Sequence, residues 1–288
     1  MTAVTGEAPV AVPRFPEPRG LFLAVLRVHR SALIFWIGLV AVAAAALLWA
    51  LGPGADAAWA EYRAMDCHGD SPNPGCDLPR PAMMRYETVV TVATALLALL
   101  PVFTGAWAGG ALIGRELEDG TARLVWTQSV TPARWLAAGL AVPALLLVPG
   151  TLALTLLHRA LWTSDNHLFR AIGWYEWHDD RVFEINGVLA TVQPLAALAL
   201  GVLAGVLLRR ALPALGAAVL AVASLTWALD ELRPRLWPTP PGTRPVMHEH
   251  PASHFWPLQL VEAGIVLAVT ALAVTAAFAL LRRTAGTA

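Results

Sequence analysis

The chain has 288 residues, of which 57% are hydrophobic and only 14% are charged, whereas a soluble domain carries about a quarter charged residues. This composition excludes an ordinary water-soluble protein, and the net charge of zero offers no basic face for nucleic acid. All 20 basic residues other than histidine are arginine, so the chain lacks the lysine of a P-loop and cannot itself be a P-loop ATPase.

Six apolar stretches are each long enough to cross the hydrocarbon core, which takes about 20 residues as a helix. The first five contain no ionisable side chain, and the sixth contains only Glu262, near its start. A carrier coupled to protons or sodium usually needs an ionisable residue near the midplane, so the pattern argues against one. The sequence predicts an all-α membrane protein with six transmembrane helices, at residues 32–51, 88–113, 135–157, 185–208, 211–229 and 258–281.

The placement of arginine predicts the orientation of these spans. One side of the membrane receives the two ends of the chain, the loop 114–134 and the short turn 209–210, with eleven arginines and five acids. The other side receives nine arginines and fourteen acids in longer loops. Positive residues next to spans favour the cytoplasm. We therefore expect a multi-pass protein of the plasma membrane with both termini in the cytoplasm.

The residues before the first span divide into two parts. Residues 1–18 are small, polar and proline-containing, which predicts a flexible tail, and residues 19–288 form a single transmembrane domain. Within residues 19–31 the apolar side chains fall mainly on one side of a helix, with Arg27 and Arg30 opposite. This pattern favours a helix lying in the membrane interface. The alternative is a simple extension of the first span.

The loop 114–134, with the sequence GRELEDGTARLVWTQSVTPAR, is the most informative polar segment. Three acids precede Gly120, which allows a sharp turn, and Thr121 is a candidate N-cap for a short helix over residues 122–128. Ser129 and Pro132 mark its end. A short helix held between two spans is suited to passing force to a cytoplasmic partner, whereas the alternative is a charged, solvated turn.

Small residues four apart within the spans predict close helix packing. The pairs are Gly105 with Gly109, Gly110 with Gly114, and Gly201 with Gly205.

The exterior loops carry two further groups of reactive residues. Cys67 and Cys76 are the only cysteines and share the first exterior loop, where either a disulfide or two free thiols are possible. The third exterior loop has His248, His250 and His254 among prolines, which allows either a zinc or copper site or a flexible loop with incidental histidines. We expect no metal and no cofactor. Neither HExxH nor GxSxG occurs, so we also expect no enzymatic activity.

Three stretches resemble the membrane subunits of type-2 ABC exporters, in particular the single-chain permeases of actinomycetes. The segment GRELEDGTARLVWTQSVTPARW at 114–135 is similar to that family's "ErE-x-GT…wTQsv…RW" loop. FEINGVLATVQPLAALALGVLAGVLLRRAL at 183–212 and FWPLQLVEAG at 255–264 are also similar, and LRVHR before the first span resembles the family's N-terminal elbow.

The resemblance implies a permease that pairs with a separate ATP-binding subunit and with a second permease subunit, as a homo- or heterodimer. The short helix would be the coupling helix, and the helix 19–31 would be the elbow on the inner leaflet, in contact with membrane lipids. Glu116 and Glu118 would pair with arginines of the partner, or with Arg115 or Arg123 of this chain. The residues expected to couple to the ATPase are Arg115, Glu116, Glu118, Gly120, Thr121, Arg123, Trp126, Gln128 and Arg134.

The expected function is export of a hydrophobic or amphipathic compound, driven by ATP that the partner binds and hydrolyses. Two other readings stay open at this point. One is a membrane sensor or immunity component that holds a cytoplasmic partner without transport, and the other is a metal-dependent membrane enzyme that uses His248 and His250.

Overall fold

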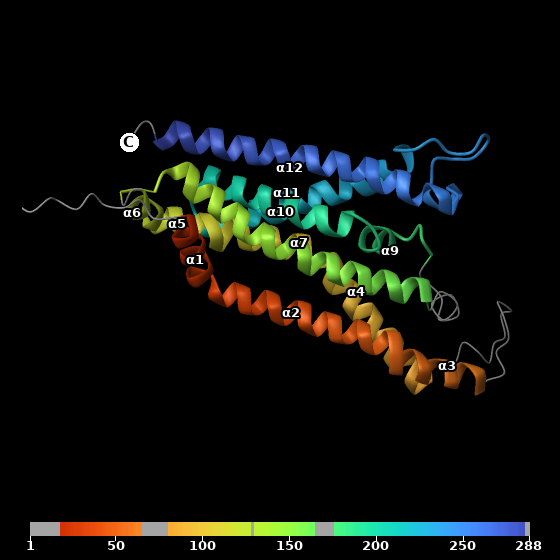
Figure 1. The fold of residues 1–288 in the computed structure, drawn as a ribbon. Coiled ribbons are helices and arrows are strands. Elements are labelled where there is room, and N and C mark those ends of the chain that lie inside the picture. The colour runs from red at the N-terminus through yellow and green to blue at the C-terminus, as the bar shows by residue number, and fades with distance from the viewer. Residues whose placement is uncertain (1–17, 65–79, 128–129, 165–175, 286–288) are drawn as a thin grey trace, which may run out of the picture.

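The computed structural model describes residues 18–64, 80–127, 130–164 and 176–285, and within these ranges the chain is helical without strands (Figure 1). Six helical stretches are long and apolar enough to cross a membrane, which confirms the predicted class of fold. They are Arg30–Ala64, Pro81–Glu118, Pro132–Ser164, Leu189–Leu208, Ala211–Arg235 and Ala252–Arg283.

Several of these stretches change helix type along their length, and short helices join them. The elements in chain order are α1 (Pro18–Val28), α2 (Arg30–Trp49), the π-helix η1 (Ala50–Gly54), α3 (Ala55–Ala64), α4 (Pro81–Trp107), the π-helix η2 (Ala108–Gly114), α5 (Arg115–Glu118), α6 (Thr121–Thr127), α7 (Pro132–Ser164), α9 (Asp180–Ile185), α10 (Leu189–Leu208), α11 (Ala211–Leu232), the 3₁₀ turns η3 (Arg233–Arg235), η4 (Met247–Glu249) and η5 (Ala252–His254), and α12 (Phe255–Ala285).

Helix α10 is the centre of the bundle. It packs against α4, η2, α7, α11 and α12, and 61% of its most apolar stretch is buried, against 11% for the stretch that contains α2. Helices α2 and α12 lie at opposite edges of the bundle (Figure 1). One end of the bundle, here called the α6 end, holds α1, α5, α6 and the last turns of α12, and the opposite end is called the α9 end (Figure 1).

Glycines allow the central backbones to come into contact, as predicted from their spacing. A methyl group on Gly201 of α10 would overlap the carbonyl oxygen of Gly105 of α4. A methyl group on Gly205 would meet Ile113 at 2.7 Å, and one on Gly109 would meet the carbonyl oxygen of Ala214 at 2.8 Å. Each distance is too short for a real side chain, so the predicted close packing of α4 and η2 with α10 and α11 is confirmed.

Two predicted spans differ from the helices in their course, one by a break and the other by an extension into a polar helix. The expected span 185–208 breaks at 186–188, so that α9 is a separate short helix before α10. The first span continues beyond its expected end through η1 and α3 to Ala64. Glu61 of α3 accepts hydrogen bonds from the backbone N–H groups of Ala82 and Met83, at 2.8 and 3.1 Å. Hydropathy could not predict this extension, because α3 is polar. The hydrogen bonds of Glu61 to the start of α4 hold it in place.

The N-terminal segment forms its own helix, α1, rather than a straight extension of α2. His29 separates the two helices with a non-helical ψ of 23°, and α1 runs at a steep angle to α2 (Figure 1). The location of α1 in the membrane interface stays a prediction, as does the division into a tail and one domain. Residues 1–17 of the tail, Cys67 and Cys76 lie outside the described residues.

The contact between Gly201 and Gly105 predicts a specific loss of stability. Gly201→Ala is expected to lower the free energy of unfolding by about 1–3 kcal/mol, because the added methyl overlaps backbone that cannot rotate away. The matched control is Gly264→Ala in α12, where a methyl meets nothing within 4 Å and alanine adds up to about 1 kcal/mol of helix propensity. Thermal unfolding in detergent measures both, and equal or higher stability of Gly201→Ala would contradict the packing.

Candidate functional site

The loop between the second and third membrane helices folds into a compact turn. Helix α5 continues directly from η2, and Gly120, with φ of +72°, reverses the chain into α6. The hydroxyl of Thr121 donates a hydrogen bond to the carbonyl of Glu116 at 3.1 Å. Gly120 thus makes the predicted turn, but Thr121 is the first residue of α6 and ties it to α5, instead of serving as its N-cap.

Glu116 connects three separate parts of the bundle. Its Oε2 accepts a hydrogen bond from Nε1 of Trp135 in α7 at 2.9 Å, and its Oε1 lies 3.5 Å from Nε2 of His29, between α1 and α2. The ring of His29 in turn packs edge-on against Trp107 of α4, with centroids 5.6 Å apart. A single half-buried carboxylate therefore joins the loop to the α1–α2 junction and to the start of α7.

Glu118 connects the loop to α11. Its Oε2 accepts a hydrogen bond of 2.7 Å from the backbone N–H of Ala211, the first residue of α11. The turn before α11 is tight, because Arg209 has φ of +51° and Arg210 is extended. A carboxylate at a helix N-terminus satisfies a free N–H group and complements the helix dipole. Glu118 thus caps α11 from a segment 93 residues away.

The remaining side chains of the loop divide into an inner and an outer set. Trp126 turns inward and packs edge-on against Trp135 at 5.8 Å, and Ala122 is fully buried. On the outer side Arg123, Leu124 and Thr127 are exposed, Leu124 by 64%. The outer face of α6 is defined here as Arg123, Leu124 and Thr127.

The expected site residues are accordingly of three kinds. Glu116, Glu118, Gly120, Thr121 and Trp126 hold the loop to itself and to the bundle. The arginines 115, 123 and 134 are exposed, and Arg115 pairs with Asp119 at 3.5 Å rather than with a glutamate. Gln128 lies outside the described residues. The role of these residues in coupling stays a prediction.

Sequence reasoning missed three partners of the loop, His29, Trp135 and Ala211, and the exposed Leu124 within it. The histidine lies in LRVHR and the tryptophan in the closing RW of the loop, and both segments stood out only through their resemblance to a family. Ala211 contributes a backbone group, which leaves no signal in a sequence.

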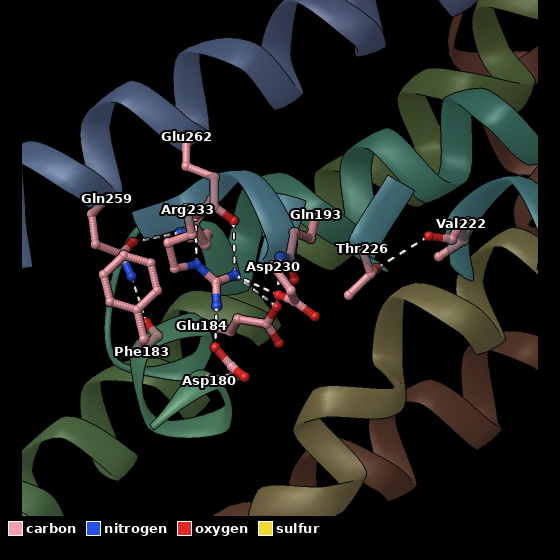
Figure 2. Close-up of polar contacts among 11 residues, drawn as sticks. Asp180, Phe183, Glu184, Gln193, Val222, Thr226, Asp230, Arg233, Gln259 and Glu262 are labelled. Carbon is pink, nitrogen blue, oxygen red and sulfur yellow. Dashed lines mark hydrogen bonds and ion pairs between the residues drawn. The ribbon is translucent and has the colours of Figure 1, made fainter. Parts of the chain in front are cut away.

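A second polar cluster lies at the α9 end, centred on Arg233 (Figure 2). The Arg233 side chain is completely buried, and Nε and Nη2 donate to the two oxygens of Glu262 at 2.8 and 3.0 Å. Nη1 donates to Asp180 at 2.8 Å, while Nη2 also lies 3.1 Å from Glu184 and 2.9 Å from Asp230. The guanidinium thus joins α9, α11 and α12.

The surroundings of this cluster are apolar as well as acidic. The guanidinium carbon of Arg233 lies 4.7 Å from the centre of the Phe183 ring, which is itself fully buried. Burial raises the pKa of the Glu184 carboxyl, and the charge of Arg233 opposes that rise. The four acids exceed the one arginine, so the cluster is stable only while the guanidinium is in place.

The break between α9 and α10 is held by side chains from distant helices. Buried Gln259 of α12 donates to the carbonyl of Phe183 and accepts from the N–H of Leu189, at 3.2 Å. A methyl on Gly187 would overlap the amide end of the Gln259 side chain, so a larger residue here would displace Gln259. Gln259 therefore supplies hydrogen bonds on both sides of the break.

Helix α7 holds the same break from the other side. Nδ1 of His158 lies 2.9 Å from the side-chain oxygen of Asn186, and Nε2 lies 3.0 Å from the hydroxyl of Thr94 in α4. Arg159 donates to the Asn186 carbonyl at 2.8 Å. His158 is buried within the third long apolar helix, so the expectation that the first five spans lack ionisable residues does not hold for the helices as they fold. The expected span ended at residue 157, whereas α7 continues to Ser164, because hydropathy does not count a buried, paired histidine as membrane sequence.

The histidines of the loop before α12 have partners within the chain. His250 is buried, with its Nε2 3.1 Å from the Pro234 carbonyl oxygen and its Nδ1 3.0 Å from Nδ1 of His254. Across residues 18–64, 80–127, 130–164 and 176–285, no three His, Cys, Asp or Glu side chains are grouped so that they could hold a metal ion.

Fold and polar sites together define a multi-pass α-helical membrane protein with an ordered, bundle-linked loop between its second and third spans. The sequence model of the family described as "ABC-2 membrane transporter related" matches residues 37–233, about two thirds of the chain. The chain belongs to this family and is of the membrane-subunit type of ABC transporters. No curated protein and no solved structure matches it.

The matched region contains both polar sites in large part. It includes the loop 114–134, the FEING segment at 183–187 and Arg233 as its last residue. The segment FWPLQLVEAG, noted above for its resemblance to the same class, supplies Gln259 and Glu262. The structure thus brings two stretches that resemble the family together, one on each side of Arg233 (Figure 2).

The Arg233 cluster predicts a large effect of a single substitution. Arg233→Gln is expected to lower the free energy of unfolding by about 3–5 kcal/mol, because Glu262 and Glu184 then remain buried without a counter-charge. Arg235→Gln, an exposed arginine two residues along, is the control and should change stability by less than about 0.5 kcal/mol. Thermal unfolding in detergent compares the two variants. Equal changes in unfolding temperature would contradict a structural role of the cluster.

Proposed function

We propose that this chain is the permease subunit of an ABC exporter, which moves a hydrophobic or amphipathic compound with ATP hydrolysed by a separate subunit. Membership of the ABC-2 membrane transporter related family supports the transporter assignment. The absence of lysine, and with it of a P-loop, supports a separate ATP-binding subunit. The chain itself would have no enzymatic activity and no cofactor. It would act with a second permease subunit, as a homo- or heterodimer, and without nucleic acid.

The α6 end of the bundle would face the cytoplasm. Exposed arginines stand next to the membrane helices at this end, at positions 27, 30, 209, 210 and 282. The positive-inside rule favours the cytoplasm for such residues. The plasma membrane would then hold the protein with both termini inside the cell, and α1 would lie in the inner interface as an elbow.

The observation that supports coupling most directly is the division of the loop into an outer face and an inner set of contacts. The outer face of α6 would dock in a cleft of the ATP-binding subunit, with Leu124 as its apolar contact and Arg123 as its charge. Glu116 and Glu118 accept hydrogen bonds from the first turns of α7 and α11. A displacement of α6 would therefore reach two membrane helices through hydrogen bonds to carboxylates, which are stronger than neutral ones.

The mechanism follows from these contacts. ATP binding would close the partner dimer and displace α6, and the polar contacts of the loop would carry the displacement into the bundle. The α1–α2 junction would follow through His29, which lies 3.5 Å from Glu116. The α9 end would stay fixed, because Arg233 joins α9, α11 and α12 there through buried ion pairs.

The test uses the complex with the ATP-binding protein that an adjacent reading frame is expected to encode. Glu116→Gln and Trp135→Phe are each expected to retain the partner but to reduce substrate-stimulated ATPase activity at least tenfold, because each weakens or removes the same 2.9 Å hydrogen bond. Glu118→Gln should act in the same direction through Ala211. Leu124→Asp, by contrast, should lose the partner itself, since it places a charge on the docking face.

The matched control is Asp119→Asn, in the same loop, whose described ion pair is with exposed Arg115. It should keep both binding and stimulation. Full stimulation in Glu116→Gln and Trp135→Phe would contradict the coupling role. A partner that binds through α6 without nucleotide-dependent transport would instead favour a sensor or immunity component.

A further inference from the structure

An apolar cavity of about 520 Å³ lies between α1, α2, α4, η2 and α7, and it shares His29 with the site around Glu116. Its size is within the range of about 300–1,000 Å³ that is usual for small-molecule sites. At the α6 end it is lined by Val25, Leu26, His29 and Ser31, at the junction of α1 and α2. Further into the bundle it is lined by leucines, including Leu39 of α2.

The cavity is polar only near one end. Leu39 follows the start of α2 by nine residues, which places it about 14 Å further along the helix. The cavity thus extends over about half the thickness of the hydrocarbon core, which is about 30 Å. The indole N–H of Trp36 in the wall is already bonded to the carbonyl of Leu146 at 3.2 Å. The inner part can therefore accept an apolar chain but offers little to a polar molecule.

The cavity opens sideways, toward the lipid. Phe35 of α2 and Phe103 of α4 line it and are nevertheless 66% and 49% exposed. Both residues lie in stretches that are apolar enough to cross the membrane, so their exposed surfaces meet lipid chains rather than water.

Two arginines beside the mouth of the cavity do not line it, but they adjoin its lining residues Leu26, His29 and Ser31 in the sequence. Arg27 and Arg30 are exposed on either side of His29, and α1 and α2 contain no acidic residue from Pro18 to Trp49. Glu116, which contacts His29 at this end, also accepts a hydrogen bond from Trp135. Arginines beside a membrane helix attract anionic head groups and bind phosphate with several N–H groups.

We propose that this cavity binds one acyl chain of an anionic membrane phospholipid whose head group rests on Arg27 and Arg30. The apolar lining, the lateral opening and the half-membrane length fit the chain, and the charge beside the mouth fits the head group. His29 lines the cavity and also lies 3.5 Å from Glu116, so lipid occupancy bears directly on the loop that contains α6. Only this last link to coupling rests on the proposed function; the binding of lipid does not.

Native mass spectrometry of the full chain, without any ATP-binding subunit, tests the binding. The probes are phosphatidylglycerol and phosphatidylcholine with identical acyl chains. At equal lipid concentrations, the wild-type protein is expected to retain one phosphatidylglycerol per chain. Retention of phosphatidylcholine should be at least about tenfold lower. Arg27→Gln combined with Arg30→Gln should abolish this preference, whereas Arg282→Gln, an exposed arginine of α12 that adjoins no lining residue in the sequence, should keep it.

Filling the cavity tests its location separately from the charge. Ala32→Trp on α2 and Ala111→Trp on η2 each place an indole in the cavity from a different wall, and both should lose the retained lipid. Ala41→Trp, on the exposed side of the same helix and outside the cavity, should retain it. Thermal unfolding of each variant shows that it is folded, and two blocking variants keep the test valid if one of them is unstable.

Three outcomes would overturn the proposal. Lipid retention in both blocking variants equal to that of Ala41→Trp would mean that the cavity is not the site. A preference for phosphatidylglycerol that survives the double arginine substitution would mean that the head group binds elsewhere. The wild-type chain could instead form a dimer without retained lipid, and Ala32→Trp and Ala111→Trp could each dissociate it. That result would show that a second copy of the chain, and not a lipid, occupies the cavity.

Discussion

The constraint on which this structure depends is that polar groups inside a membrane bundle must find partners within the chain. Hydrocarbon offers no hydrogen bonds, so every break in a helix and every buried charge must be satisfied by another helix. Gln259 bonds on both sides of the α9–α10 break, and Glu262 binds Arg233 with both of its oxygens. These contacts join α9, α10, α11 and α12 at one end. The protein achieves this with few residues, because each of them serves two elements at once.

The two ends of the bundle meet this constraint differently. At the α9 end the contacts are buried ion pairs around Arg233, whose removal leaves acids without a counter-charge. At the α6 end the carboxylate of Glu116 is partly buried and that of Glu118 is exposed, and they bind an indole, an imidazole and a backbone N–H. Contacts of the second kind can be rearranged at lower cost, because water replaces them. Under the proposed function, the α9 end would be the fixed part of the permease and the α6 end the part that responds to the partner.

Much of the fold could be predicted from the sequence because hydrocarbon solvation acts on composition alone. The number of membrane helices follows from the length and polarity of the runs, and the close packing around Gly201 and Gly205 follows from their spacing. The break at 186–188 could not be predicted in this way. The run 185–208 is apolar apart from Asn186, Thr191 and Gln193, and the residue that stabilises its interruption, Gln259, lies some 70 residues later.

The candidate site was predictable in position but not in its connections. The turn at Gly120 and the short helix after it could be read from local signals, and the structure contains both. The partners of Glu116 and Glu118 could not, since they come from three other elements and one of them is a backbone amide. Arg233 gave no local signal either, because a single arginine after an apolar run is normally a charge at the membrane surface. Only its burial among four acids from three elements shows its role.

The central claim is that the loop containing α6 and the first turns of α7 and α11 respond to the ATP-binding subunit as one unit. Hydrogen exchange of the assembled complex, with and without a non-hydrolysable ATP analogue, measures this directly. The account predicts that the analogue changes amide protection together in residues 115–127, in the first turn of α7 and in the first turn of α11, including the Ala211 amide that Glu118 binds. A change confined to α6, with no change at the starts of α7 and α11, would contradict it.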